Sequence, residues 1–581
     1  MIIAHVGRFA APGFTRRVRY LLAAFAYFYS FARPALCDSC RAAKPHTPTA
    51  AEDAYLHGKF TEAENLFRQG LAENPNDPVI TAALVRSLLR QQKVSDAAVQ
   101  IKSAVAAAPK SAVLLTALAE VQYRQGLIVE SGQSAAAAYN EDICYARVHL
   151  IRALLASLNS MYATERKEIT VAHGLDPYDP DIRGRWIETL PIEQRISELK
   201  RYLGEPGGLD EKEHKGAEDY LERLEKVSTG PVRRCRLVST ANSTKLQLES
   251  ILGYQLRTRS WALMAKLNNT SAKLELDTGA SGLLINRKIA DKAGLKAVAS
   301  NEVSGFGDSG PLKGFTAFAD SIRVGNLEFR DCLVEVNDRN DLENADGLIG
   351  TDIFEDFLVS LDIPLHFLEL SPLPARPGET PHAASLQTET QIQNPSADVH
   401  SDATENGDSK SGENKATVSS EKQEVIGPKD RYIAPEMKNW FPIFRVGHDL
   451  IIPGLIDKTD MKLFIIDTGS EAMILSEAAA SEIRRIYESP ETKITGVSGE
   501  VKHVYTGGAF NFRFADKSMS TREAAIFDLS SASTDTGVEI SGFIGLPALK
   551  LMTIHIDYRD GLMKFDYDPT TIPGDRGFGE Q

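Results

Sequence analysis

Two parts of the sequence repeat the same landmarks in the same order, and this duplication limits the possible folds more than any other feature. Asp-Thr-Gly occurs at 277–279 and at 467–469, each time after an apolar, strand-like run. Gly-apolar-Ile-Gly follows at 347–350 and at 542–545. An Asp then lies twelve residues beyond the last glycine in both copies (362 − 350 = 12; 557 − 545 = 12). The shared order predicts two related β-rich lobes, each with one aspartate on a tight glycine-containing loop.

This pattern resembles the lobes of aspartic proteases, over roughly residues 237–370 and 431–570. Each copy has the length of a retropepsin-like lobe, which normally pairs as a homodimer, whereas two lobes in one chain resemble pepsin-like enzymes. The resemblance implies that Asp277 and Asp467 are the catalytic pair. The residues that it implies as support for the catalytic loops are Thr278, Gly279, Ser281, Thr468, Gly469 and Ser470.

Two carboxylates brought face to face account for peptide hydrolysis without a metal or an organic cofactor. Like charges a few ångströms apart share one proton. The ionised member takes a proton from water as the water attacks the peptide carbonyl, and the protonated member stabilises the developing oxyanion. The substrate is expected to lie extended between the lobes, hydrogen-bonded as an added strand.

The residue after each Asp-Thr-Gly differs between the lobes, Ala280 in the first and Ser470 in the second. A hydroxyl at Ser470 can donate to the neighbouring carboxylate and favour its charged form. We therefore expect Asp467 to be the ionised partner and Asp277 to carry the shared proton. Ser281 is the hydroxyl that is expected to be within reach of Asp277.

A glycine-rich stretch between the landmarks of the first lobe is interpreted as a flap hairpin over the substrate, at Gly305, Phe306 and Gly307. Its counterpart in the second lobe is Gly496 and Gly499. The first stretch also fits G-x-G-x-x-G, but the dinucleotide fingerprint needs a following helix, and Pro311-Leu-Lys-Gly314 begins none. Gly-Asp-Ser-Gly-Pro at 307–311 is similar to a serine protease loop, yet no matching histidine motif is found.

Residues 44–179 carry a second repeat, which resembles the tetratricopeptide repeat. Ala63 and Ala97 lie 34 residues apart, as do Pro75 and Pro109. Small residues at such positions let paired helices approach, and proline ends the second helix. The alternative is an alanine-rich bundle without true repeats. A repeat array offers a concave surface for a protein partner.

The N-terminus predicts export. Arginines precede a short apolar run, Leu21–Ala32, which suits a signal peptide that is either cleaved or kept as an anchor. The only expected membrane contact is through this segment. Among the five cysteines, Cys37 and Cys40 abut the signal, while Cys144, Cys235 and Cys332 are far apart in sequence. Buried free thiols are the expectation for these three.

The composition separates the remaining segments. No aromatic residue occurs between 372 and 428, which predicts a disordered linker. The net charge of −14 argues against nucleic acid as a partner. The fold class is therefore multidomain, an α-helical repeat solenoid followed by two β-rich, closed-barrel-like lobes. The expected divisions are 1–43 signal or anchor, 44–179 repeats, 180–236 helical spacer, 237–370 lobe 1, 371–430 linker, 431–570 lobe 2 and 571–581 tail.

The leading hypothesis is an exported aspartic endopeptidase that acts on polypeptides and recruits protein through its repeats. The alternative is a non-catalytic module that uses the lobes and the repeats as binding surfaces. An idle lobe has no chemical need for its aspartate, which favours the enzyme. Two arrangements of the pair remain open, since the two aspartates can meet within one chain or between like lobes of two chains.

Overall fold

The computed structural model describes the repeats and both lobes. The described residues are 40–228, 235–252, 258–303, 305, 307–310, 312–338, 344–377, 428–457, 460–483, 485–488 and 494–567. The expected signal segment (except for residues 40–43), the central part of the expected linker, the expected tail and Phe306 lie outside these residues.

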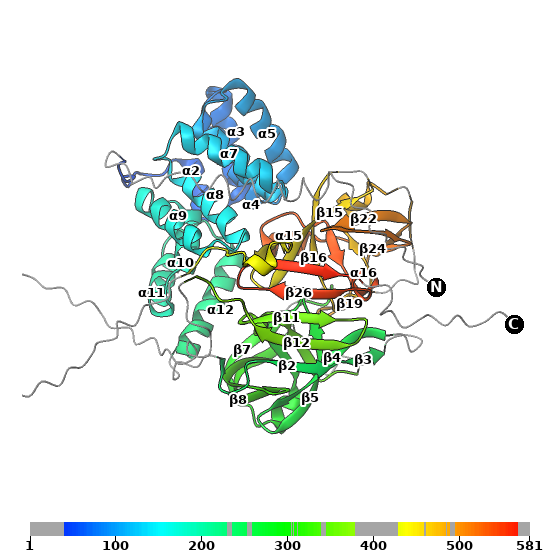
Figure 1. Cartoon of the computed structure of the whole chain (residues 1–581). Helices are drawn as coiled ribbons and strands as arrows, with labels where there is room; N and C mark the ends of the chain where they lie inside the picture. Colours follow the sequence, from blue (N-terminus) through cyan, green and yellow to red (C-terminus); the bar gives the residue numbers. More distant parts are fainter. Residues whose placement is uncertain are drawn as a thin grey trace, which may run out of the picture.

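The N-terminal part of the chain is an array of antiparallel helix pairs, as the 34-residue period predicts (Figure 1). Side-chain caps start several of the helices: Asp77, for example, accepts hydrogen bonds from the backbone N–H groups of Val79 and Ile80. Among the described residues no helix combines the length and the apolar character that a membrane crossing requires. The helices are α2 (Ala50–Leu56), α3 (Phe60–Glu73), α4 (Pro78–Arg90), α5 (Val94–Ala107), α6 (Ala112–Arg124), α7 (Ile128–Glu141), α8 (Ala146–Leu158), α9 (Tyr162–Leu175), α10 (Pro180–Glu188), α11 (Ile192–Leu203) and α12 (Glu211–Ser228).

Lobe 1 is built on a nine-stranded sheet in which β8 pairs with both β4 and β9. Its strands bury alternate side chains, so one face of the sheet covers the lobe core. The strands are β1 (Arg236–Leu237), β3 (Glu249–Leu252), β4 (Thr258–Leu267), β5 (Thr270–Asp277), β6 (Leu283–Asn286), β7 (Ala297–Val303), β8 (Leu312–Val324), β9 (Leu327–Asn337) and β10 (Gly347–Gly350).

Lobe 2 repeats this plan with a ten-stranded sheet in an open order, next to the two-stranded hairpin of β19 (Thr495–Gly496) and β20 (Gly499–Glu500). The short helix α15 (Ser530–Thr536) precedes its last strand. The strands of the sheet are β14 (Phe444–Val446), β15 (Asp449–Ile456), β16 (Lys462–Ile466), β17 (Ile474–Leu475), β18 (Ile486–Glu488), β21 (Tyr505–Gly507), β22 (Phe510–Phe514), β23 (Lys517–Thr521), β24 (Ala524–Ile526) and β25 (Gly542–Ile544).

A six-stranded sheet joins the lobes. Its two central strands, β11 (Phe357–Asp362) and β26 (Thr553–Asp557), are antiparallel neighbours that come from different lobes. They are also the strands that end in the duplicated Asp of the sequence pattern. Ser360 lies opposite His555 in the register, and their side chains are hydrogen-bonded at 2.8 Å. The outer strands are β12 (Phe367–Pro372) and β2 (Thr244–Gln247) on one side, and β27 (Leu562–Asp566) and β13 (Phe441–Pro442) on the other.

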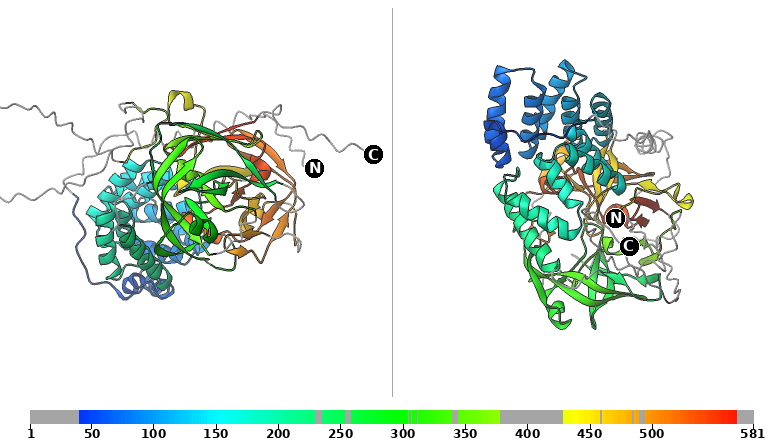
Figure 2. Two further views of the ribbon diagram at one scale, coloured as in Figure 1. Left: turned by 90° about the horizontal axis from the view of Figure 1, so that it is seen from below. Right: turned by 90° about the vertical axis from the view of Figure 1, so that its left-hand side faces the viewer.

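The helical array packs on lobe 2 through a continuous apolar core. Ile151 and Leu155 of α8 belong to the same buried cluster as Leu463 of β16 and Phe543 of β25. The backbone N–H of Glu539 donates to the carbonyl of Arg124 at 2.9 Å across this boundary. In both views of Figure 2 the array lies along one side of the two lobes. The repeats are therefore part of the protease-like body and not a separate appendage.

Two disulfides replace the free thiols that the sequence analysis expected, so that expectation is wrong. Cys40 pairs with Cys144, and Cys235 pairs with Cys332. The first links the start of the described chain to the repeats, and the second links the segment after α12 to β9 of lobe 1. Partners separated by 104 and 97 residues leave no spacing pattern in a sequence.

The shared core predicts that a cavity on the repeat side destabilises lobe 2. Leu155→Ala should lower the free energy of unfolding by about 2–5 kcal/mol, because Leu155 is 1% exposed. Hydrogen exchange of β25 should accelerate with it. The exposed Val99→Ala, at 74% exposure, should change stability by no more than about 0.5 kcal/mol. Unchanged exchange in β25 after Leu155→Ala would show that the two parts unfold independently.

Candidate active site

Each lobe presents its aspartate where two parallel strands end side by side. In lobe 1, β5 and β10 are parallel, and Asp277 is in register with Gly350. In lobe 2, β16 and β25 are parallel, and the N–H of Asp467 donates to the carbonyl of Ile544 at 3.1 Å. The second landmark of the sequence pattern thus supports the first, because its glycine strand lies beside the strand that leads into the aspartate loop. No side chain fits between these backbones: a Cβ on Gly350 would lie 2.3 Å from the carbonyl oxygen of Ala280.

The two aspartate loops are joined by four reciprocal hydrogen bonds of Thr278 and Thr468, both of which are buried. The hydroxyl of Thr278 donates to the carbonyl of Ile466 at 2.8 Å and accepts from the N–H of Thr468 at 3.0 Å. The hydroxyl of Thr468 donates to the carbonyl of Leu276 at 3.1 Å and accepts from the N–H of Thr278 at 3.0 Å. These bonds fix the loops to each other across the lobe boundary.

The carboxyl groups of Asp277 and Asp467 face each other and are hydrogen-bonded together. The N–H of Gly279 donates to Oδ1 of Asp277 at 2.8 Å, and the N–H of Gly469 donates to Oδ1 of Asp467 at 2.9 Å. Each glycine also lies against the opposite carboxyl. A Cβ on Gly469 would lie 2.6 Å from Cγ of Asp277, and one on Gly279 would lie 3.0 Å from Cγ of Asp467. The structure brings together all of these predicted loop residues within one chain.

Burial and mutual repulsion keep a proton on the pair. Burial, and then the charge of Asp467, raise the pKa of Asp277 to about 8. Burial also raises the pKa of Asp467, to about 6, while the hydrogen bond from Asp277 and the N–H groups of Gly469 and Ser470 lower it. The pair therefore titrates as a coupled unit in which Asp277 holds its proton more tightly.

The lower pKa of Asp467 relative to Asp277 has a different cause from the predicted hydroxyl of Ser470. The backbone N–H of Ser470 donates to Asp467 at 3.0 Å, whereas its hydroxyl donates to the carbonyl of Ala472. The hydroxyl of Ser281 donates to Asp352 at 3.3 Å. In lobe 2, two N–H groups of the aspartate loop, those of Gly469 and Ser470, donate to Asp467. In lobe 1, the N–H of Gly279 is the donor from the same loop to Asp277.

Several supporting residues are absent from the sequence prediction. Asp352 accepts from the N–H of Gly282 at 2.9 Å and so holds the end of the lobe 1 loop. His448, from the turn between β14 and β15 of lobe 2, lies with Nε2 at 3.2 Å from the carbonyl oxygen of Gly279. Arg259 pairs with the buried Glu275 at 2.9 Å and lies 3.9 Å from Glu471. Glu471 adds a negative charge four residues after Asp467, and the guanidinium of Arg259 faces it. Only proximity in the fold identifies these residues, since none belongs to a repeated motif.

The two expected flap hairpins meet at their tips. The N–H of Gly305 donates to the hydroxyl of Ser498 at 3.1 Å, and the N–H of Ser309 donates to the carbonyl of Ser498 at 2.8 Å. A Cβ on Gly307 would lie 2.3 Å from the carbonyl oxygen of Gly499, so the contact requires glycine. Gly496 lies in β19 of the same lobe 2 hairpin. Described glycines from both predicted flaps thus lie in one cross-lobe contact.

Family models match two parts of the chain. Residues 263–353 match the model described as aspartyl protease, and residues 54–121 match the tetratricopeptide repeat model. The chain thus contains an aspartyl protease domain and tetratricopeptide repeats, which confirms the two resemblances seen in the sequence. No curated protein matches the chain.

Solved structures that are similar to parts of the chain include repeat proteins and aspartic proteases. A thermophilic tetratricopeptide repeat protein from Thermus thermophilus is 21% identical, covering 29% of this chain and 91% of its own, with a TM-score of 0.24. The aspartic proteinase from Irpex lacteus is 12% identical, covering 57% and 99%, with a TM-score of 0.33. A retropepsin-like aspartic protease from Rickettsia conorii is 20% identical, covering 24% and 96%, with a TM-score of 0.17.

The threonine bonds predict a sharp difference between two substitutions. Thr278→Val keeps the shape of the side chain but leaves the carbonyl of Ile466 and the N–H of Thr468 without their partner. We expect it to lower the free energy of unfolding by roughly 1–3 kcal/mol for each group left unpaired. Thr278→Ser keeps the hydroxyl and should stay near the wild-type stability. Denaturant unfolding measures both, and equal losses for the two variants would contradict the role of the hydroxyl.

The raised pKa of Asp277 predicts a pH-dependent stability. The unfolded residue titrates near 4, so between about pH 4 and pH 8 the folded state binds the proton more tightly, and stability falls as the pH rises. Asp277→Asn removes this loss and should raise the unfolding midpoint at pH 8 far more than at pH 4. The exposed Asp291→Asn serves as the control and should shift neither midpoint. A gain from Asp277→Asn that is the same at both pH values would exclude a titration of Asp277.

Proposed function

We propose that the chain is an aspartic endopeptidase whose catalytic pair, Asp277 and Asp467, forms within one chain. The observation that carries this proposal is the face-to-face pair of hydrogen-bonded carboxyls, held by the reciprocal bonds of Thr278 and Thr468. An arrangement that raises the pKa of both acids suits a pair that must share one proton.

In the proposed reaction, the ionised Asp467 takes a proton from a water molecule as the water attacks the peptide carbonyl. Asp277, which holds its proton more tightly, donates a hydrogen bond to the carbonyl oxygen as charge develops there. The N–H groups of Gly469 and Ser470 support the negative charge on Asp467. Collapse of the intermediate transfers a proton to the leaving amine and yields two peptide fragments.

The expected substrate is a polypeptide in extended form, lying between the lobes and beneath the two hairpins that contain Gly305, Gly307, Gly496 and Gly499. Flanking strands and hairpins offer backbone groups to such a chain, as sheet edges do. For the substrate to enter, the hydrogen bonds between Gly305, Ser309 and Ser498 must open. The repeats are proposed to contribute a binding surface for protein.

Export remains part of the proposal, with the N-terminal segment as a signal peptide or an anchor. The pairing of Cys40 with Cys144 and of Cys235 with Cys332 supports it. Disulfides persist in oxidising compartments such as the bacterial periplasm or the extracellular space, and they are rare where cytosolic reductants act.

A second candidate is a binding module that holds peptides between the lobes without cleaving them. The flap contact favours this function as much as catalysis, since both need a covered groove. The raised pKa values favour the enzyme, because burying two facing acids is unfavourable and peptide binding alone does not need it. Zymography with an unstructured protein at several pH values, with and without a transition-state-mimic inhibitor, separates the two.

Substitution of each aspartate tests the single-chain pair. Asp277→Asn and Asp467→Asn should each lower the hydrolysis rate by at least about 100-fold, because each removes the shared-proton chemistry. Rates of the wild type should be proportional to enzyme concentration, and Asp291→Asn should retain activity. Substantial activity in both single variants, together with a steep loss on dilution, would instead indicate that like lobes of two chains pair.

A further inference from the structure

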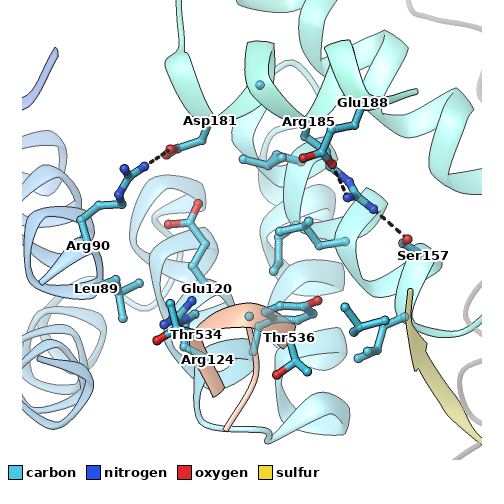
Figure 3. A pocket seen from close by; sticks show the side chains of 18 of the residues that line it. Leu89, Arg90, Glu120, Arg124, Ser157, Asp181, Arg185, Glu188, Thr534 and Thr536 are labelled. Carbon is cyan, nitrogen blue, oxygen red and sulfur yellow. Dashed lines mark hydrogen bonds and ion pairs between the residues drawn. The ribbon is translucent and has the colours of Figure 1, made fainter. Parts of the chain in front are cut away.

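A cavity of about 750 Å³ lies between the helical repeats and lobe 2. Its walls come from helices α4, α6, α8 and α10 on the repeat side, and from the segments 445–447 and 534–537 of lobe 2. Figure 3 shows Arg90 and Asp181 on one side, Arg185 with Glu188 and Ser157 on the other, and Arg124, Thr534 and Thr536 along the lower part of the view. The volume suits a few amino-acid residues of a bound chain.

The lining of this cavity combines aliphatic and tyrosine side chains with a group of charged residues. Six arginines and four acidic residues line it, and three of the arginines also pair with acidic residues outside the lining, namely Arg90 with Glu213, Arg147 with Asp179 and Arg185 with Glu165. Most of the charge is neutralised internally. Arg147 pairs with Glu120 and Asp181, and Arg185 pairs with Glu188.

Arg124 differs from these cations, because its side chain is hydrogen-bonded to the neutral amide of Gln92. Its Nε is buried without a partner among the described residues. Burial, and the nearby charge of Arg90, lower the pKa of Arg124, whereas acidic neighbours raise the pKa of Arg90 and Arg147. A partly buried cation whose hydrogen-bond partner is a neutral amide is a favourable place for a carboxylate from outside the protein.

One turn of lobe 2 connects the cavity with the catalytic pair. Arg445, Val446 and Gly447 line the cavity, and the next residue, His448, contacts the carbonyl of Gly279 at 3.2 Å. Gly279 in turn lies against the carboxyl of Asp467. Since an extended chain advances about 3.3 Å per residue, a substrate that leaves the catalytic site along this turn reaches the cavity within a few residues.

We propose that this cavity is an exosite for an acidic segment of the polypeptide substrate, with a carboxylate of that segment paired to Arg124. This inference rests on the proposed protease function and adds a substrate class to it. In this proposal the repeats bind another segment of the substrate polypeptide that the lobes cleave, and they do not recruit a separate partner protein.

Binding of two matched peptides to the full-length Asp277→Asn protein tests the proposal without hydrolysis. One fluorescein-labelled twelve-residue peptide carries three Glu residues at one end, and the other carries Gln at the same positions. The Glu peptide should bind at least about tenfold more tightly, and Arg124→Gln should remove that difference while leaving binding of the Gln peptide unchanged. Arg124→Lys should restore part of the preference. Arg68→Gln, on α3 and outside the cavity lining, is the matched control and should keep it.

The same substitutions in the active protein give a second readout. Arg124→Gln should raise KM for the Glu peptide and leave kcat unchanged, because the exosite is remote from the reacting atoms. Equal binding of both peptides, or equal losses from Arg124→Gln and Arg68→Gln, would overturn the proposal. If the wild type does not hydrolyse the peptides but still binds the Glu peptide more tightly in an Arg124-dependent way, the protease function is rejected and the binding site for acidic segments is retained. Hydrolysis without charge preference would reject the site alone.

Discussion

The whole arrangement depends on the reciprocal hydrogen bonds between Thr278 and Thr468. Both hydroxyls are buried, and each bonds to the backbone of the other loop. Buried polar groups need partners, so neither loop is satisfied unless the lobes meet in this one register. That register places Asp277 against Asp467, and it makes the raised pKa of both acids a consequence of lobe pairing. The central strands β11 and β26 impose the same register from the six-stranded sheet.

The position of the repeats changes what they are expected to do. A free array offers its concave surface to another protein. Here α8 shares an apolar core with β16 and β25, and the cavity beside it is closed by α15 and the turn at 445–447. The surface of the repeats that was expected to bind another protein is thus largely covered by lobe 2. The lobe 2 residues 445–447 that line this cavity are followed directly by His448, which contacts the aspartate loop of lobe 1 at Gly279.

The sequence was sufficient to predict the two lobes, the two Asp-Thr-Gly loops and the helical repeats, because each of these depends on local patterns. The catalytic role of Asp277 and Asp467 stays a prediction. An apolar run followed by Asp-Thr-Gly describes a strand and its loop, and a 34-residue period describes a helix pair. The family models confirm an aspartyl protease domain and tetratricopeptide repeats. The contact of His448 with Gly279, the disulfides and the cavity around Arg124 depend on segments far apart in the chain, for which one sequence contains no signal. The role of Ser470 was misjudged because a backbone N–H, which every residue except proline has, replaces the expected hydroxyl.

The dependence of inhibitor binding on protein concentration tests the central claim most directly. A peptide inhibitor with a hydroxyl that mimics the tetrahedral intermediate should displace water between the two carboxyls, and calorimetric titration of the full-length protein counts the sites. A pair formed by Asp277 and Asp467 of one chain predicts one inhibitor per chain, at protein concentrations that span the range from monomer to any dimer. Like lobes of two chains would form two sites per dimer, which is also one per chain, but these sites would be lost when the dimer dissociates. Binding that is lost on dilution, or one inhibitor per two chains, would therefore contradict a catalytic site built within a single chain.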